Sequence, residues 1–225
     1  PRHDLLLDEV LLRRGKHAEA ARRLEPRYRK HPQNADLAGL YARALDALGR
    51  RAKAVVAYAR RLRLVPTDPR AALRMGTLLL AQGDALHASQ IAAAGSRSHP
   101  RHAGLRVLNA RALLRRGRLA GAQKAANAAL QIKPEQVAGW LVLARIQIGL
   151  GERTEAERSV QRGLTYDRQR VDALRLLASL RAARGAPNLA VITLKRALAV
   201  QPDNPTLLNA IATQRFRLGQ TSLAI

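Results

Sequence analysis

The sequence predicts an all-α protein built from a 34-residue repeat, because three residue types return at that spacing along the chain. Glycine returns at every step: Gly15, Gly49, Gly83, Gly117, Gly151, Gly185 and Gly219. Alanine follows each glycine by five residues: Ala20, Ala54, Ala88, Ala122, Ala156, Ala190 and Ala224. Proline returns at Pro32, Pro66, Pro100, Pro134 and Pro202, and Arg168 fills the one slot without it. Such a period is typical of solenoids, in which each repeat packs on its neighbours.

The period divides the chain into six full repeats and part of a seventh, which we expect to form one continuous domain. The expected repeats are residues 1–34, 35–68, 69–102, 103–136, 137–170, 171–204 and 205–225. The first begins directly at Pro1, and the last stops at Ile225 inside its second helix. Because terminal repeats normally differ from internal ones, we expect a segment of a longer array. The alternative is that the final half-helix covers the last apolar face itself.

Each repeat is expected to form two amphipathic helices, as the fifth repeat illustrates. Trp140 and Leu143 lie at helical spacing in its first half, and Ala156 and Val160 do so in its second half. Gly151, between the halves, tolerates the positive φ of a helix C-terminus. Proline after the second helix would end it. The recurring alanine provides the small side chain that lets the two helices approach closely.

This pattern resembles the tetratricopeptide repeat (TPR), and the resemblance extends over the whole chain. The residues that match its consensus are Tyr58, Gly76, Ala129, Trp140, Leu143 and Ala197. Several consensus aromatic positions hold aliphatic residues instead: Ala38, Leu45, Leu79 and Leu113. The resemblance implies a right-handed superhelical solenoid of antiparallel helix pairs, with a slimmer core in each repeat. Pro26 lies inside the expected second helix of the first repeat, and we expect it to shorten or kink that helix.

Composition limits the function classes. The 225 residues carry 40 Lys and Arg against 16 Asp and Glu, a net charge of +24, and contain no cysteine. Disulfide scaffolds, cysteine-based zinc sites and cysteine nucleophiles are therefore excluded. No apolar run reaches the roughly 20 residues of a membrane-spanning helix. His99 and His102 are the nearest approach to a metal pair, but they have no third ligand nearby. We therefore predict no catalytic residue, no metal and no cofactor.

The resemblance implies that fixed positions of each first helix line a concave groove that binds a protein or peptide. The basic residues expected there are Arg43, Arg70, Arg74, Arg111, Arg115, Arg145 and Arg175. The aliphatic residues expected there are Leu73, Leu80, Val107, Leu114, Leu141 and Ile148. With neighbouring helices about 8–10 Å apart, Arg111 and Arg145 would stand side by side. Guanidinium groups pair with carboxylates in a two-pronged geometry, so we expect an acidic or extended partner segment. The alternative is a solvated face with incidental arginines.

A second basic surface is expected on the outer, convex side. It comprises Arg22, Arg23, Arg27, Arg29 and Lys30 in the first repeat and Arg60, Arg61 and Arg63 in the second. It suits an anionic polymer or surface, such as an exopolysaccharide, membrane headgroups or nucleic acid. Specific reading of nucleic acid is not favoured, because the few aromatic residues are scattered and provide no stacking platform. The alternative is an ordinary soluble surface in an arginine-rich protein.

Three expectations remain open. Self-association through uncapped ends is a further alternative for the partner. The abundance of Ala, Leu and Arg resembles bacterial TPR proteins, which often serve envelope or secretion assemblies, although fold-level analogy cannot choose among them. Absence of cysteine is compatible with either cytoplasm or periplasm, and the analogy slightly favours the periplasm.

Overall fold

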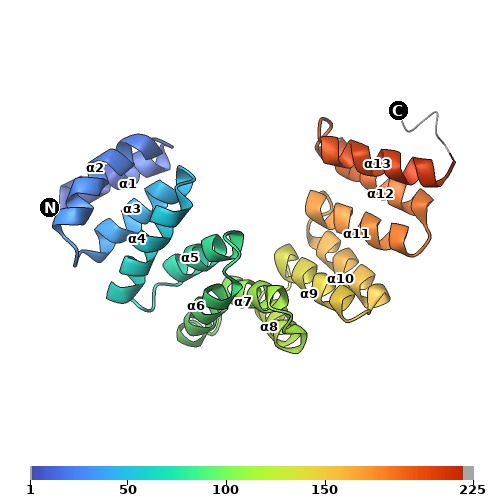
Figure 1. The fold of residues 1–225 in the computed structure, drawn as a ribbon, viewed down its shortest axis with the longest axis horizontal. Coiled ribbons are helices and arrows are strands. Elements are labelled where there is room, and N and C mark those ends of the chain that lie inside the picture. Colours follow the sequence, from blue (N-terminus) through green and yellow to red (C-terminus); the bar gives the residue numbers. More distant parts are fainter. Residues whose placement is uncertain (1, 220–225) are drawn as a thin grey trace. The chain divides into compact units, whose positions relative to one another are not determined.

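The computed structural model describes residues 2–219, and these form thirteen α-helices without a strand (Figure 1). The odd-numbered, first helices of the repeats are α1 (Arg2–Arg13), α3 (Ala35–Ala47), α5 (Pro69–Ala81), α7 (Ala103–Arg115), α9 (Val137–Gly149), α11 (Val171–Ala183) and α13 (Pro205–Arg217). The even-numbered, second helices are α2 (His17–Lys30), α4 (Arg51–Leu64), α6 (Ala85–Ser98), α8 (Leu119–Ile132), α10 (Arg153–Tyr166) and α12 (Pro187–Val200). The all-α repeat fold predicted from the period is confirmed.

The helix ends follow from the residues that recur. Every glycine of the register, from Gly15 to Gly219, has a positive φ between 69° and 88° and closes the turn after a first helix. Several first helices are capped by a side chain at the residue before them: the Asn34 side chain accepts the N–H of Leu37, and the Asp68 side chain accepts those of Arg70 and Ala71. Such caps satisfy N–H groups that have no partner inside the helix.

The recurring alanine acts as the sequence predicts. All six that lie in described residues, Ala20, Ala54, Ala88, Ala122, Ala156 and Ala190, have no exposed surface, and Ala224 lies outside those residues. Gly76 serves a similar purpose between first helices, because a Cβ there would lie 2.6 Å from Leu108 Cδ2. Small residues therefore set how closely the helices pack.

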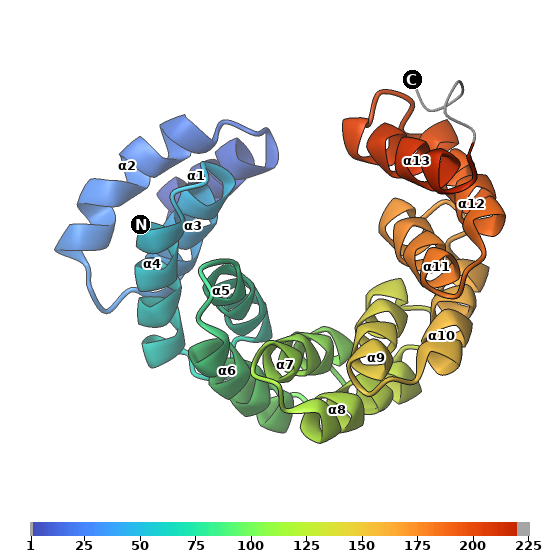
Figure 2. The same cartoon turned by 45° about the vertical axis from the view of Figure 1, so that its right-hand side comes forward.

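The chain forms two compact units, which divide inside the fourth repeat, between α7 and α8. Unit 1 reaches Arg116 and unit 2 begins at Gly117. In unit 1, α2, α4 and α6 lie on one side and the first helices on the other (Figure 2). The core of unit 1 includes Leu24, Leu45 and the tyrosine pair Tyr28–Tyr41, whose ring centroids are 4.8 Å apart. The core of unit 2 is built from small aliphatic side chains: Ala156, Val160, Leu174, Leu177, Ala190 and Leu207 are among its members.

Pro26 does not shorten its helix, contrary to the expectation. α2 runs through it and has 14 residues, the same length as α4. Proline removes one N–H and crowds the preceding turn. On either side of the exposed Pro26, Leu24 and Tyr28 are buried in the core, and this packing outweighs the local cost.

Within residues 2–219, no helix combines the length and the apolar character that crossing a membrane requires.

Candidate functional site

A groove of about 860 Å³ opens on the first-helix side of unit 1. Its walls come mainly from α1, α3 and α5, which contribute Leu5, Leu12, Leu40 and Leu73. Two side chains from α4, Tyr58 and Arg61, also reach it. The groove is therefore aliphatic along its length, with polar groups at defined points, which is the usual character of a binding pocket.

Four of the predicted groove residues line this cavity: Arg43, Arg70, Leu73 and Arg74. Arg43 belongs to α3, and the other three belong to α5. Leu80 is buried in the core near the end of α5, so its methyl groups pack inside the protein. The predicted arginines of the second and third repeats therefore lie on the face of unit 1 that holds this cavity.

The predicted residues on α7 lie outside this cavity. Val107 is buried, Leu114 is half-buried, and Arg111 and Arg115 are exposed. In unit 2, Leu141 is buried, whereas Arg145, Ile148 and Arg175 are exposed. Because Arg111 lies in unit 1 and Arg145 in unit 2, the expected row of arginines across them stays a prediction.

Arg74 is held by an acidic side chain of the neighbouring first helix. Its Nε and Nη2 donate to Asp46 Oδ2 over 2.8 and 2.5 Å. Tyr58 Oη donates weakly to the same oxygen over 3.4 Å. Burial and the Asp46 carboxylate raise the pKa of Tyr58 to about 12, so the phenol stays protonated and acts as a donor. The hydrogen bonds to Asp46 raise the pKa of Arg74. Asp46 therefore compensates one of the groove's guanidinium groups.

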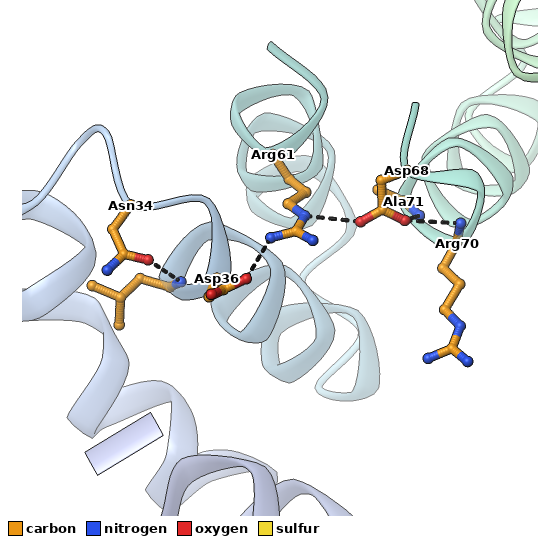
Figure 3. A network of polar contacts seen from close by, with 7 residues as sticks. Asn34, Asp36, Arg61, Asp68, Arg70 and Ala71 are labelled. Atoms are coloured by element: carbon orange, nitrogen blue, oxygen red, sulfur yellow. Dashed lines mark hydrogen bonds and ion pairs between the residues drawn. The ribbon is translucent and has the colours of Figure 1, made fainter. Parts of the chain in front are cut away.

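Arg61 links two neighbouring first helices, as Figure 3 shows. Its Nη1 lies 2.8 Å from Asp36 Oδ1 at the start of α3, and its Nε lies 2.8 Å from Asp68 Oδ2, the residue that caps α5. Burial tends to lower the pKa of Arg61, but the hydrogen bonds to both carboxylates outweigh it and raise the pKa. Gly39 lies beside this link: a Cβ there would meet Arg61 Cδ at 3.5 Å, an ordinary contact, so only a side chain longer than that of alanine would compete with Arg61 for the space.

Arg61 was expected on the convex surface, but it lies in the wall of the groove, so the expectation is wrong for this residue. Sequence reasoning also missed Tyr58 in the groove. The available signal was Gly39, which stands where the first and third repeats have Leu5 and Leu73. A glycine at a position that is bulky elsewhere indicates that another side chain fills the space.

Other cations of the expected convex surface also serve the fold. Arg23 Nε lies 3.1 Å from Asp8 Oδ1, Arg27 pairs with the other carboxylate oxygen, and the Asp8 side chain is fully buried. Arg60 lies 3.8 Å above the centre of the Tyr28 ring and donates to the Tyr28 carbonyl over 3.0 Å. A buried carboxylate requires such partners. These arginines are therefore already engaged within the protein.

Arg43 and Arg70 differ from the arginines around them. Both residues are exposed, and neither forms an ion pair with any residue in the described part of the chain. In Figure 3 the Arg70 side chain extends away from the network around Arg61. The groove therefore presents two uncompensated cations beside its leucines.

One of the two histidines singled out in the sequence, His102, has a local role in the fold. His102 Nδ1 accepts the N–H of Leu105 over 3.2 Å and so caps α7. Among the side chains of the described residues, no group of three potential ligands gathers in a metal-binding arrangement.

Comparison with known proteins identifies the repeat. Two family models, both described as tetratricopeptide repeat, match residues 11–76 with 113–180 and residues 73–137. No curated protein matches the chain.

Solved structures share the fold. The APC/C hetero-tetramer Cut9-Hcn1 aligns with a TM-score of 0.75 at 18% identity, covering 93% of this chain and 42% of that one. This chain thus spans less than half of that protein's length. A thermophilic TPR protein from Thermus thermophilus, TTC0263, gives 0.69 at 23% identity, with coverage of 78% and 95%. YrrB, described as a TPR protein with an unusual peptide-binding site, gives 0.58 at 16% identity, with coverage of 83% and 96%. Since one repeat model alone covers more than half of the residues, the chain belongs to the tetratricopeptide repeat family.

Proposed function

We propose that this TPR protein is a noncatalytic scaffold that binds an acidic, aliphatic segment of a partner protein in the unit 1 groove. TPR proteins as a family mediate interactions between proteins. The observation that carries the finer proposal is the pair of uncompensated guanidinium groups, Arg43 and Arg70, beside an aliphatic wall. From the arginine-rich composition, we further propose that the partner belongs to a bacterial envelope or secretion assembly.

The charges in the groove support an acidic ligand. Arg74 is matched by Asp46, and Arg61 is matched by Asp36 and Asp68. Glu9 at the groove edge pairs with Arg13 over 3.0 Å. The lining holds four arginines and four acidic residues, but two of the carboxylates face Arg61 and the Glu9 carboxylate faces Arg13 outside the lining, so Arg43 and Arg70 are left without a carboxylate partner. A ligand carboxylate near Arg43 or Arg70 would gain a charge-assisted hydrogen bond without displacing an internal partner.

The aliphatic wall supports a ligand with apolar side chains. Leu5, Leu12, Leu40 and Leu73 offer methyl groups to the cavity. Burial of apolar surface provides affinity that salt does not screen, whereas the arginines provide orientation and speed of association. YrrB, whose described peptide-binding site lies on the same fold, supports a peptide as the ligand type for TPR chains.

The proposal can be tested with peptides selected from a random acidic dodecapeptide library on the purified 225-residue protein. Affinity is measured by fluorescence anisotropy for the protein and for the Arg43→Glu/Arg70→Glu variant. We expect the variant to bind at least about tenfold more weakly, because two attractive charge contacts become repulsive. The control is Arg63→Glu/Arg97→Glu, which changes the net charge equally at exposed positions on α4 and α6. Equal losses in both variants would show that net charge, not the groove, determines binding.

Salt dependence separates this proposal from an electrostatic binder of an anionic polymer. Affinity for a polyanion falls steeply between low and physiological salt, because counterions compete for the same cations. A groove ligand with buried leucines keeps much of its affinity over that range. On the expected convex surface, Arg23, Arg27 and Arg60 already contact residues of the protein itself. They are therefore less available to a polyanion, which favours the groove as the binding site.

A further inference from the structure

The outer face of α12 is apolar where an exposed helix face is normally polar. Leu189, Ile192 and Val200 are 49%, 56% and 40% exposed, and they recur at helical spacing along one stripe. The inner side of the same helix is also apolar, with Ala190, Leu194 and others in the core. A helix that is apolar on both sides usually has both sides covered.

A second row of apolar side chains crosses this stripe. Ile132, Tyr166 and Val200 are the last residues of α8, α10 and α12 and occupy the same position in three successive repeats. All three are exposed. Figures 1 and 2 show these three helices along one side of unit 2. The corresponding helices of unit 1 end in Lys30, Leu64 and Ser98, so the row is particular to unit 2.

Cations accompany the apolar residues. Lys195 and Arg196 lie on the exposed side of α12, and Arg162 lies on α10, 5.7 Å from the Trp140 ring centre. None of the three takes part in an ion pair within residues 2–219. The sequences of α8 and α12 contain no acidic residue. On α10, Glu155 pairs with Arg158, and Glu157 pairs with Arg181 and Arg184, while Asp167 directly follows Tyr166. The face thus combines exposed aliphatic groups, one tyrosine and positive charge.

We propose that this face of unit 2, formed by Ile132, Tyr166, Leu189, Ile192, Lys195, Arg196 and Val200, binds the surface of an anionic lipid bilayer. Interfacial helices bury aliphatic side chains at the boundary between headgroups and acyl chains while their cations meet anionic headgroups. Tyrosine is enriched at that boundary because its ring is apolar and its hydroxyl is polar. This contact is separate from the unit 1 groove, so a scaffold that holds a partner in unit 1 would also be held at a membrane through unit 2.

The arrangement fits an extended surface better than another protein helix or a second copy. The apolar residues extend in two directions, along α12 and across α8, α10 and α12, whereas a single docked helix covers one direction. Lys195 and Arg196 lie near the middle of the stripe that runs from Leu189 to Val200. If two copies of the protein paired symmetrically through α12, these four cations would come together, and contact between like charges opposes association.

The test is co-sedimentation of the 225-residue protein with vesicles at about 150 mM salt, the ionic strength at which distant charges are screened. One set of vesicles contains equal parts of phosphatidylglycerol and phosphatidylcholine, and the other contains phosphatidylcholine alone. We expect binding to the anionic vesicles and little to the neutral ones. The variants Leu189→Ser/Ile192→Ser and Lys195→Glu/Arg196→Glu should each lower the partition coefficient about tenfold.

The matched control is Val56→Ser/Leu86→Ser, which changes two aliphatic residues of similar exposure, 61% and 46%, on α4 and α6 in unit 1. This control should partition as the unchanged protein does, and circular dichroism should show that all variants keep their helices. Absence of binding to the anionic vesicles would overturn the proposal. So would equal losses in the control, or a Leu189→Ser/Ile192→Ser variant that binds fully, because attraction would then be electrostatic only.

Discussion

Arg61 and Asp68 join the second helix of one repeat to the first helix of the next, with Arg61 Nε 2.8 Å from Asp68 Oδ2. Asp68 also accepts the N–H groups of Arg70 and Ala71, so one carboxylate caps α5 and receives the guanidinium group. Both side chains are largely shielded, being 20% and 17% exposed. The helix that carries Arg70 into the groove is therefore positioned by this pair.

Arg61→Met should lower the free energy of unfolding by about 1–3 kcal/mol, because Asp68 loses a shielded, charge-assisted partner while the aliphatic stem is kept. The measurement is the chemical denaturation curve at neutral pH. Arg63→Met, an exposed change two residues away, should stay within about 0.5 kcal/mol of the unchanged protein. If Arg61→Met proved as mild as Arg63→Met, the link between α4 and α5 would not contribute to stability.

Acid should remove the contribution of Asp68. Burial tends to raise the pKa of Asp68, but the Ala71 N–H and the Arg61 guanidinium outweigh it and hold the pKa below its usual 3.8. A carboxyl group whose folded-state pKa is lowered stabilises the protein fully above the unfolded pKa, and this stability is lost as pH falls through the folded pKa. The stability gap between the protein and Asp68→Asn should therefore be largest at neutral pH and shrink below pH 3.8.

Denaturation curves at pH 7 and near pH 2.5 would measure that gap, with Glu155→Gln as the control. Glu155 is exposed and, among residues 2–219, pairs with the nearby Arg158, so its gap should be small at both pH values. A gap for Asp68→Asn that stays constant over the range would mean that its charge has no part in stability.

Asp46→Asn should strengthen binding of acidic peptides to the groove by about three- to tenfold, since Arg74 then loses its internal carboxylate partner and becomes available to the ligand. Anisotropy titrations with the selected peptides would measure this change. Glu155→Gln removes the same charge in unit 2 and should leave affinity almost unchanged. Weaker binding by Asp46→Asn, with the fold intact, would indicate that Asp46 instead positions the groove.

Sequence patterns predicted the fold because they are imposed by local geometry. Gly15 and its equivalents have positive φ, and the recurring alanines are fully buried, as the period implies. Pro26 was the local exception, because burial of Leu24 and Tyr28 on either side keeps α2 intact. Within the groove, the pattern selected Arg43, Arg70, Leu73 and Arg74 by their repeat positions. It also selected Leu80, Val107 and Leu141, which the structure buries, because position alone does not determine how closely a neighbouring helix covers a side chain.

By itself, the sequence determined that this chain is a 34-residue helical repeat with a strongly basic surface. Glycine, alanine and helical spacing act within one repeat, and net charge is a sum over residues. Only the tertiary structure decided which cations are available. Arg61 and Arg74 are compensated by carboxylates from other helices, at sequence separations of 7 to 28 residues, whereas Arg43 and Arg70 are not. Ion pairs depend on distances between side chains, and those distances arise only when neighbouring repeats pack.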